Sequence, residues 1–201
     1  MKKKENLKIS KEVIDNLRNI DITSLSDVCV SKVSMNHLIK PKINTHKIVG
    51  TAVTLKLPKG DSLTVQKALN IAKAGDVLVV DSGGSVENAV WGDLRSLKAK
   101  KKGLEGVVID GAIRDIVGCR EIGFPIFSKY LVCASSTKIG GGEINIPITC
   151  GDILVHPGDV IIGDENGVIV LPKSNIHSII EKALKREQEI QLEKEKILNE
   201  V

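Results

Sequence analysis

The chain has 201 residues, of which 29 are basic and 25 are acidic, giving a formal net charge of +4. This length allows one domain to bury a full core. The small positive excess lies largely in Lys2, Lys3 and Lys4, and only 2% of the residues are aromatic. We therefore expect no nucleic-acid partner, because single-strand binders usually stack bases on aromatic rings.

The cysteines and the N-terminal segment indicate the compartment. We expect reduced, mostly buried thiols, because no C-x-x-C pair or zinc-spaced histidine accompanies Cys29, Cys119, Cys133 and Cys150. No apolar run follows the basic start of the chain, and none is long enough to cross a membrane. The sequence predicts one cytoplasmic domain over residues 1–201, with no membrane partner and a flexible N-terminus over residues 1–10.

The first part of the chain alternates helical and strand patterns. Residues 11–20 can form a short helix, and a second helix within residues 22–38 has Thr23 or Ser24 as its candidate N-cap. Residues 48–57 alternate as a strand does. Residues 62–74 have apolar residues at helical spacing and end at Gly75, which is typical of a helix stop.

The segment from Gly75 to Asp115 contains two short β-branched runs, residues 77–80 and 107–109. They are typical of buried parallel strands joined by a helical crossover. Ligands of open α/β sheets gather at the carboxyl ends of such strands. Acidic and glycine residues follow both runs, so we expect a site built by Asp81, Ser82, Gly83 and Gly84 on one strand and Asp110, Gly111, Arg114 and Asp115 on the other.

Between these strands, Gly92 interrupts the helical pattern within Trp91-Gly92-Asp93-Leu94-Arg95. A helix that starts there would point free backbone N–H groups at an anion. The sequence therefore predicts a carboxylate pair, a guanidinium group and an amide cradle in one unit.

The rest of the chain reads as a short helix, a glycine-rich β region and a long helix. Residues 112–122 predict a helix closed by Gly123, and residues from 140 onward predict short strands in a curled antiparallel sheet, a β-rich half packed on an α/β half. Residues 174–201 predict a long helix with an N-terminal Ser cap. Its apolar stripe comprises Ile176, Ile180, Ala183, Ile190, Ile197 and Val201. A partner subunit would explain this stripe, which Glu187 interrupts, whereas Glu189 points away.

Several motifs together resemble one family. Asp93, twenty further residues and then Arg114-Asp115 match the D-x20-R-D signature of the class II pyruvate aldolases that cleave 4-hydroxy-4-methyl-2-oxoglutarate and 4-carboxy-4-hydroxy-2-oxoadipate. These enzymes share their fold with the RraA-like regulators of RNase E. The resemblance spans residues 24–172 and includes GDVLVVD, AVWGDL, GVVIDGAIRD, GDILVHPGDVI and DENGVIVLP.

The resemblance implies an α/β fold layered β/β/α, like the swivelling phosphohistidine domain, with a long C-terminal oligomerisation helix over residues 174–201. It implies a divalent-metal-dependent lyase that releases pyruvate from a 4-hydroxy-2-oxo acid and that could also decarboxylate oxaloacetate. A homotrimer or hexamer is implied as well. The alternative is a non-catalytic RraA-like regulator that binds RNase E or another protein.

The resemblance also assigns roles to individual residues. Asp115 would hold Mg²⁺ or Mn²⁺, whose preferred ligands are a few carboxylates and several waters, and Asp93 would act through metal-bound water. We take a metal-bound water oriented by Asp93 as the general base, although the identity of the base stays open. Arg114 would bind the 2-oxo acid and stabilise its charge. The carboxylate of the substrate would be received by the backbone amides of Gly92, Asp93, Leu94 and Arg95.

Family members complete the site with a glutamate from an adjacent subunit, which we place at Glu187, with Glu189 as the alternative. In the alternative without a functional role, Arg114-Asp115 is an ordinary exposed pair that follows a turn at Asp110-Gly111. In the corresponding alternative, Glu187 is a solvated glutamate on the helix surface. The physiological substrate, the metal used and the choice between trimer and hexamer stay open.

Overall fold

The computed structural model describes residues 9–200. Its helices are α1 (Lys11–Asn19), α2 (Ile22–Asp27), α3 (Val65–Ile71), α4 (Asp93–Lys101), α5 (Ile116–Ile122) and α6 (Ile176–Asn199), with a 3-10 turn at Lys173–Asn175. Its strands are β1 (Lys40–Ile43), β2 (Ile48–Lys56), β3 (Asp76–Asp81), β4 (Ala89–Trp91), β5 (Gly106–Ile113), β6 (Ile126–Leu131), β7 (Glu143–Ile144), β8 (Ile148–Cys150), β9 (Ile153–Val155), β10 (Val160–Asp164) and β11 (Gly167–Leu171).

One mixed sheet organises the described residues. Its strands follow the order β1-β6-β5-β3-β2-β10-β11, with β4 attached to β5 and β7 attached to β2. The pairs among β2, β3, β5 and β6 are parallel, as the crossover pattern predicts, whereas β10 and β11 add antiparallel strands at the β2 side. The predicted parallel pair of residues 77–80 and 107–109 is confirmed as β3 and β5.

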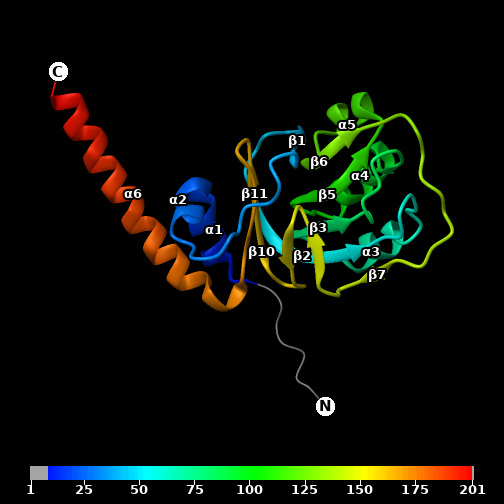
Figure 1. Ribbon diagram of the computed structural model, residues 1–201, viewed down its shortest axis with the longest axis horizontal. Helices are drawn as coiled ribbons and strands as arrows, with labels where there is room; N and C mark the ends of the chain where they lie inside the picture. The colour runs from blue at the N-terminus through cyan, green and yellow to red at the C-terminus, as the bar shows by residue number, and fades with distance from the viewer. Residues whose placement is uncertain (1–8, 201) are drawn as a thin grey trace, which may run out of the picture.

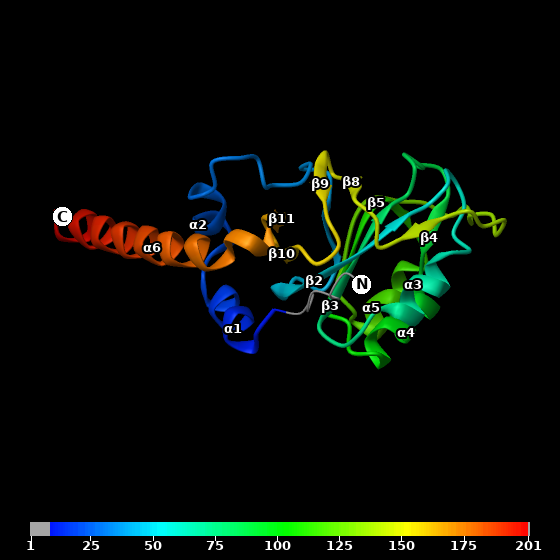
Figure 2. The same ribbon diagram turned by 90° about the horizontal axis from the view of Figure 1, so that it is seen from below.

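Alternation along the central strands divides their side chains between two faces. Leu78 and Val80 of β3 point into a core beneath α3, α4 and α5, while Val77 and Val79 point into a core beneath the β8–β9 hairpin. Figure 2 shows the three helices on one side of the sheet and β8 and β9 on the other. The predicted β/β/α layering is therefore confirmed.

A third core joins the N- and C-terminal helices to the antiparallel side of the sheet. Leu17 of α1, Leu25 of α2 and Ile180 of α6 pack with Ile162 of β10 and Leu171 of β11. Beyond this contact, α6 leaves the sheet and runs out to the C-terminus (Figure 1). The predicted long C-terminal helix is confirmed, although α6 begins at Ile176 after the 3-10 turn and has no side-chain cap.

Other expectations about the elements are also wrong. The N-cap of the second helix is Asp21 and not Thr23 or Ser24, and the helix expected to stop at Gly75 already ends at Ile71. The second helix ends at Asp27, because Val33 and Ser34 pair with β11 instead. The helix expected over residues 112–122 begins only at Ile116, since β5 continues to Ile113. The glycine-rich strands are divided between two sheets, because β7 and β10 hydrogen-bond to β2 within the main sheet, whereas β8 and β9 form a separate antiparallel sheet.

The remaining expectations concern the ends of the chain, the thiols and the membrane. The predicted flexible segment 1–10 lies mostly outside the described residues, but Ser10 accepts a hydrogen bond from Val13 N and caps α1. Cys119 and Cys150 are buried free thiols, Cys29 is half-buried and Cys133 is exposed. Within residues 9–200, no helix has the length and apolar character needed to cross a bilayer.

Candidate active site at the start of α4 and α5

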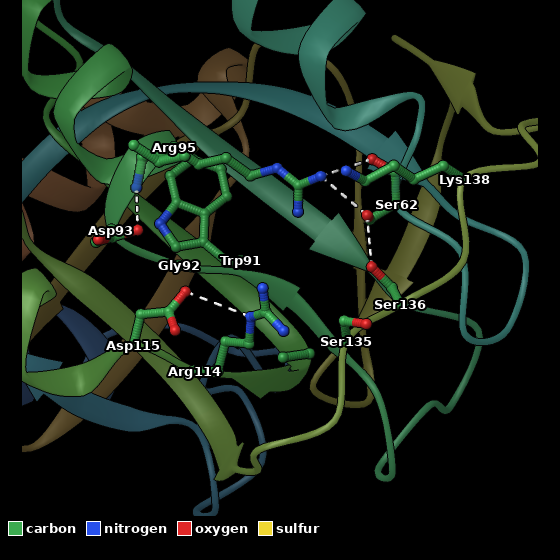
Figure 3. Close-up of a pocket in the computed structure, with 12 residues that line it drawn as sticks. Ser62, Trp91, Gly92, Asp93, Arg95, Arg114, Asp115, Ser135, Ser136 and Lys138 are labelled. Carbon is green, nitrogen blue, oxygen red and sulfur yellow. Dashed lines mark hydrogen bonds and ion pairs between the residues drawn. The ribbon is translucent and has the colours of Figure 1, made fainter.

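A pocket of about 270 Å³ lies where α4 and α5 begin. Its lining residues are Ser62, Ala89, Trp91, Gly92, Asp93, Leu94, Arg95, Arg114, Asp115, Ser135, Ser136 and Lys138. Every residue of the predicted carboxylate, guanidinium and amide set therefore faces one cavity (Figure 3). The roles assigned to these residues remain predictions.

Two glycines allow the pocket carboxylates to approach the backbone. A Cβ on Gly92 would lie 2.5 Å from Asp115 Oδ2, and a Cβ on Gly118 would lie 3.0 Å from Asp93 Oδ2. Gly92 has φ −165°, so the close contact, and not the backbone conformation, calls for glycine there. Asp115 itself adopts the left-handed region with φ 57°, an uncommon conformation that aspartate tolerates better than most residues.

A β-bulge directs the end of β5 toward the pocket. The register between β5 and β6 shifts between Ile109 and Ala112, and Arg114 N then donates to Trp91 O at 3.0 Å. Bulges often redirect a strand beside an active site. As a result, Arg114 and Asp115 reach the start of α4, where Arg114 Nε lies 3.3 Å from Asp115 Oδ2. Both side chains are 41% exposed, so they are accessible to a ligand.

A buried hydrogen-bond chain holds the beginning of α4. Trp91 Nε1 donates to Ser96 Oγ at 2.9 Å, and Ser96 Oγ donates to Gly92 O at 2.9 Å. Cys119 Sγ lies 3.7 Å from the same hydroxyl. Burial raises the pKa of the Cys119 thiol, and the nearby Asp93 and Asp115 add to this effect. Cys119 therefore packs behind the pocket, where these effects favour its neutral thiol.

The amide cradle at the start of α4 differs in one position from the expectation. The first helical bond joins Ser96 N to Gly92 O at 3.1 Å, which leaves the earlier amides available to a ligand. Leu94 N, however, already donates to Asp93 Oδ1 at 2.6 Å. The Asp93 and Arg95 amides are therefore better placed to receive a carboxylate than the Leu94 amide.

Comparison with known proteins identifies the family to which the chain belongs. A family model described as RraA-like, Aldolase/RraA, matches residues 12–170. The chain belongs to the Aldolase/RraA family. The resemblance inferred from the motifs is thus confirmed.

Relatives of this Aldolase/RraA chain include proteins named as enzymes and proteins named as inhibitors. A protein of Halalkalibacterium halodurans named "Putative 4-hydroxy-4-methyl-2-oxoglutarate aldolase" is 40% identical over 176 residues, which cover 88% of this chain and 84% of the relative. Streptomyces coelicolor RraAS2, described as an unusual member of the RNase ES inhibitor RraA protein family, aligns with a TM-score of 0.84 and 26% identity over 93% of this chain and 98% of that one. The RNA-processing inhibitor RraA from Thermus thermophilus aligns with a TM-score of 0.70 and 32% identity over 76% of this chain and 92% of that one.

The oxygen donors in the pocket fit a hard divalent cation. Asp93 and Asp115 both line the cavity, and residues 9–200 contain no cluster of three or more His, Cys, Asp or Glu side chains that could hold a metal. Mg²⁺ suits such a sparse set, because it usually keeps several waters and takes only one or two carboxylates from the protein. The pocket of the Aldolase/RraA chain is thus compatible with the predicted Asp115 site.

Glu187 does not reach this pocket within its own chain. It lies on α6, at the other end of the molecule from α4 and α5 (Figure 1). Its Oε1 accepts a hydrogen bond of 2.6 Å from Asp21 N, at the N-cap of α2. Glu189 lies 3.7 Å from Arg186 on the same helix. A role for either glutamate at the pocket therefore requires a second copy of the chain.

The carboxyl end of β3, with the glycines that follow it, and the middle of β5 stabilise the fold and do not line the pocket. Asp110 pairs with Lys129 Nζ at 2.5 Å, and its other oxygen accepts from Gly151 N at 2.7 Å. Ser82 Oγ donates to Asp110 O at 2.6 Å. These contacts attach the β8–β9 side to the sheet, so the expectation that Asp81–Gly84 and Asp110-Gly111 build the site is wrong.

Sequence reasoning missed one entire wall of the pocket. Ser62, Ser135, Ser136 and Lys138 line it, but they come from two irregular segments with no recognisable motif. Thr137 N donates to Gly60 O at 2.8 Å and Ser62 N donates to Thr137 O at 3.0 Å, so the two segments are joined backbone to backbone. The only signal in the sequence was the serine-rich run before Lys138, which composition alone does not distinguish from a loop.

Proposed function

We propose that this protein is a divalent-metal-dependent lyase that cleaves a 4-hydroxy-2-oxo acid, such as 4-hydroxy-4-methyl-2-oxoglutarate, to release pyruvate. The observation that carries the proposal is the convergence of Asp93, Arg114 and Asp115 on one pocket beside the start of α4. The name of the Halalkalibacterium relative supports the same activity.

The chain offers a complete binding arrangement for the 2-oxo acid end of the substrate. The amides at the start of α4 carry the positive end of the helix dipole and would receive the carboxylate. Arg114, accessible and next to Asp115, would donate hydrogen bonds to the 2-oxo oxygen. Asp115, with Asp93 nearby, would hold Mg²⁺ or Mn²⁺.

Cleavage begins when the hydroxyl at C4 loses its proton, for which Asp93 would orient the accepting water. The electrons of the O–H bond form a carbonyl, and the C3–C4 bond breaks to leave the enolate of pyruvate. Arg114 stabilises the oxygen of that enolate, whose negative charge is larger in the transition state than in the substrate. Asp115 would hold the divalent cation, which when bound would supply additional positive charge for the developing enolate. The water that accepted the hydroxyl proton would return a proton to C3, which gives pyruvate and leaves the water as it began.

The same arrangement supports two extensions. Oxaloacetate would lose CO₂ through the same pyruvate enolate, so decarboxylase activity is part of the proposal. We also propose a homotrimer or hexamer in which Glu187, or Glu189 in its place, approaches the pocket of a neighbouring copy, because within one chain neither glutamate reaches its own pocket.

The alternative function is regulation of an RNase or of another protein without catalysis. The close structural match to RraAS2 and to the Thermus RraA favours it. The presence of Asp93, Arg114 and Asp115 in one pocket favours the enzyme, because a binding protein has no need of this set.

The test is pyruvate release from 4-hydroxy-4-methyl-2-oxoglutarate and from oxaloacetate, with Mg²⁺, with Mn²⁺ and after removal of divalent ions by chelation. We expect activity with either ion and its loss on chelation, with restoration when the ion is added back. Asp115→Asn should lower activity by about 100-fold or more, as loss of a transition-state contact does. Full activity after chelation would refute metal dependence, and no pyruvate from either compound would favour the regulator.

A further inference from the structure

The pocket has two walls of different chemistry. The α4 and α5 wall carries Asp93, Asp115 and Arg114, which the proposed function uses. Figure 3 shows the other wall, formed by the guanidinium group of Arg95 together with Ser62, Ser135, Ser136 and Lys138. We call this set the Arg95 wall. It lines the same cavity, yet no step of the proposed cleavage involves its side chains.

The Arg95 guanidinium is held in a defined position on this wall. Its Nη2 donates to Ser62 O at 3.1 Å and to Ser62 Oγ at 2.9 Å, and its Nη1 donates to Val90 O. Ser136 Oγ donates to Ser62 Oγ at 2.5 Å, which extends the same network. Arginine has five N–H donors, so these bonds leave two of them without a partner among the described residues.

The Arg95 wall is cationic and lacks a carboxylate on the pocket surface. Arg114 lies across the pocket, and both guanidinium groups point toward its middle (Figure 3). Burial lowers the pKa of Arg95, and the charge of Arg114 lowers it further. Lys138 is exposed and has no ion pair among the described residues. The charge of Asp61, behind the wall, partly opposes this lowering of the Arg95 pKa, but both Asp61 oxygens accept hydrogen bonds from Leu63 N, Thr137 Oγ1 and Ile139 N.

Arg114 already has Asp115 beside it, whereas Arg95 donates its hydrogen bonds to Val90 and Ser62. An anionic ligand at the Arg95 wall would therefore reduce the repulsion between the two guanidinium groups. A fixed guanidinium with free donors, flanked by hydroxyl groups and a lysine, suits a carboxylate. The cavity, of about 270 Å³, is large enough for a small diacid.

We propose that the Arg95 wall binds the second carboxylate of the substrate, so that Arg95 and Lys138 determine the preference of the pocket for 2-oxo acids with a distal carboxylate. The inference rests on the proposed function for the position of the 2-oxo acid end, at Arg114 and the start of α4. It adds the residues that recognise the opposite end of the molecule. The guanidinium provides directed hydrogen bonds, and Lys138 contributes charge at the pocket mouth.

The test compares two ligands that differ only at the distal end. 2-Oxoglutarate carries a carboxylate where 2-oxovalerate has a methyl group. Calorimetric titration of each into the full chain with Mg²⁺ should give at least about tenfold tighter binding of 2-oxoglutarate, because hydrogen bonds to charged groups commonly contribute this much. A ratio near one in the unmodified chain would overturn the proposal.

Variants of the Arg95 wall then show which residues produce the preference for 2-oxoglutarate over 2-oxovalerate. Lys138→Gln should reduce the binding ratio several-fold by weakening 2-oxoglutarate alone, and it removes an exposed charge that does not support the fold. Arg95→Lys should reduce the ratio further, because lysine cannot keep the fork of directed donors. Lys101→Gln, an exposed lysine on α4 outside the pocket, should leave the ratio unchanged. An unchanged ratio in both Arg95→Lys and Lys138→Gln would refute the assignment.

The binding ratio does not depend on turnover, so the two proposals can fail separately. A strong preference for 2-oxoglutarate in a chain that releases no pyruvate would support the proposed role of the Arg95 wall and refute the proposed lyase activity. Pyruvate release with a binding ratio near one would support the proposed lyase activity and refute the proposed carboxylate subsite.

Discussion

Gly92 and Asp115 illustrate how closely single residues define this pocket. Asp115 lies in a left-handed conformation after β5, and its Oδ2 occupies the space that a side chain at Gly92 would need. Residues in uncommon conformations persist where the surroundings hold them, often at functional sites. The absence of a Cβ at Gly92 is therefore a condition for the Asp115 position.

Gly92→Ala should displace the Asp115 carboxylate, because the new methyl group would lie 2.5 Å from Oδ2. We expect kcat/KM for pyruvate release to fall by about 100-fold, the typical result of a 1 Å misplacement at a reacting centre. Asp115→Ala provides the background for a double-mutant cycle. If Gly92→Ala acts through Asp115, adding it to Asp115→Ala should cost little more. Fully additive losses would contradict this explanation.

Asp61 holds the segment that carries the Arg95 wall. It is only 2% exposed and accepts from Leu63 N at 2.9 Å, Thr137 Oγ1 at 3.0 Å and Ile139 N at 2.5 Å. Burial raises its pKa, but these hydrogen bonds outweigh burial and lower the pKa below the ordinary value of 3.8. The bonds therefore stabilise the folded chain through the ionised form.

Asp61→Asn should reduce the free energy of unfolding by about 1–3 kcal/mol at neutral pH, because the amide cannot accept all three bonds. The carboxylate contribution is complete above pH 3.8 and disappears as the pH falls below that value through the lowered folded-state pKa. The difference between wild type and Asp61→Asn in denaturant unfolding should thus shrink in acid. Asp15→Asn, on the exposed face of α1, is the matched control. A difference that grows in acid would exclude this assignment.

At the scale of elements, the start of α4 depends on a strand and a helix that are neighbours in the chain. β4 ends at Trp91 and α4 begins at Asp93, so the turn between them is a single residue. The bonds from Trp91 Nε1 to Ser96 Oγ and from Ser96 Oγ to Gly92 O fix this turn from within the core. The amides that would receive a substrate carboxylate are positioned by these contacts.

Ser96→Ala should destabilise the chain by about 1–3 kcal/mol, because it leaves the buried Trp91 N–H without its acceptor. We also expect KM for the 2-oxo acid to rise more than kcat falls, since the α4 amides would lose their orientation. Ser96→Thr retains the hydroxyl and is the matched control for its loss. Equal KM values in wild type and Ser96→Ala would show that the serine supports only stability.

At the scale of the whole molecule, helix α6 is the feature that bears on association with a second copy of the chain. Its first half packs on α1 and α2 through Ile176, Ile180 and Ala183, but its second half extends from the sheet (Figure 1). Leu192, Ile197 and Leu198 are 59%, 59% and 76% exposed. Such apolar side chains on a protruding helix favour contact with another copy. The predicted stripe is therefore buried only in its first half, and Val201 lies outside the described residues.

Replacing Leu192 and Ile197 together with Glu should lower the mass of the particle in solution, because charged side chains oppose burial in a subunit interface. Light scattering after size-exclusion chromatography measures this mass, and we expect a trimer or hexamer for wild type. Glu193→Gln, on the exposed surface of the same helix, is the control. A wild-type monomer would eliminate the shared pocket.

Glu187→Gln separates the two roles that the glutamate could have. The amide oxygen of Gln can still accept from Asp21 N, so the cap on α2 and the thermal stability should be kept. Loss of the charge should lower kcat by about 100-fold if Glu187 takes part in proton transfer. Glu189→Gln should have little effect. Wild-type kcat in Glu187→Gln, with a loss in Glu189→Gln, would assign the role to Glu189.

The sequence by itself determined the elements whose patterns are local. The alternating run of β2, the paired strands β3 and β5 and the helical spacing of α6 follow from short-range periodicity, which depends only on the polypeptide geometry. The motif around Asp93, Arg114 and Asp115 also identified the family and one wall of the pocket, because those residues lie beside recognisable strand and helix ends.

Only the tertiary structure decided which segments meet across the sheet. Asp110 carries the same acidic, glycine-bearing signature as a site residue, yet a bulge in β5 turns it toward Lys129 and the β8–β9 hairpin. The Arg95 wall combines residues near position 62 with residues near position 136 through hydrogen bonds between irregular segments. Such contacts depend on long-range packing and loop closure, which no local pattern records.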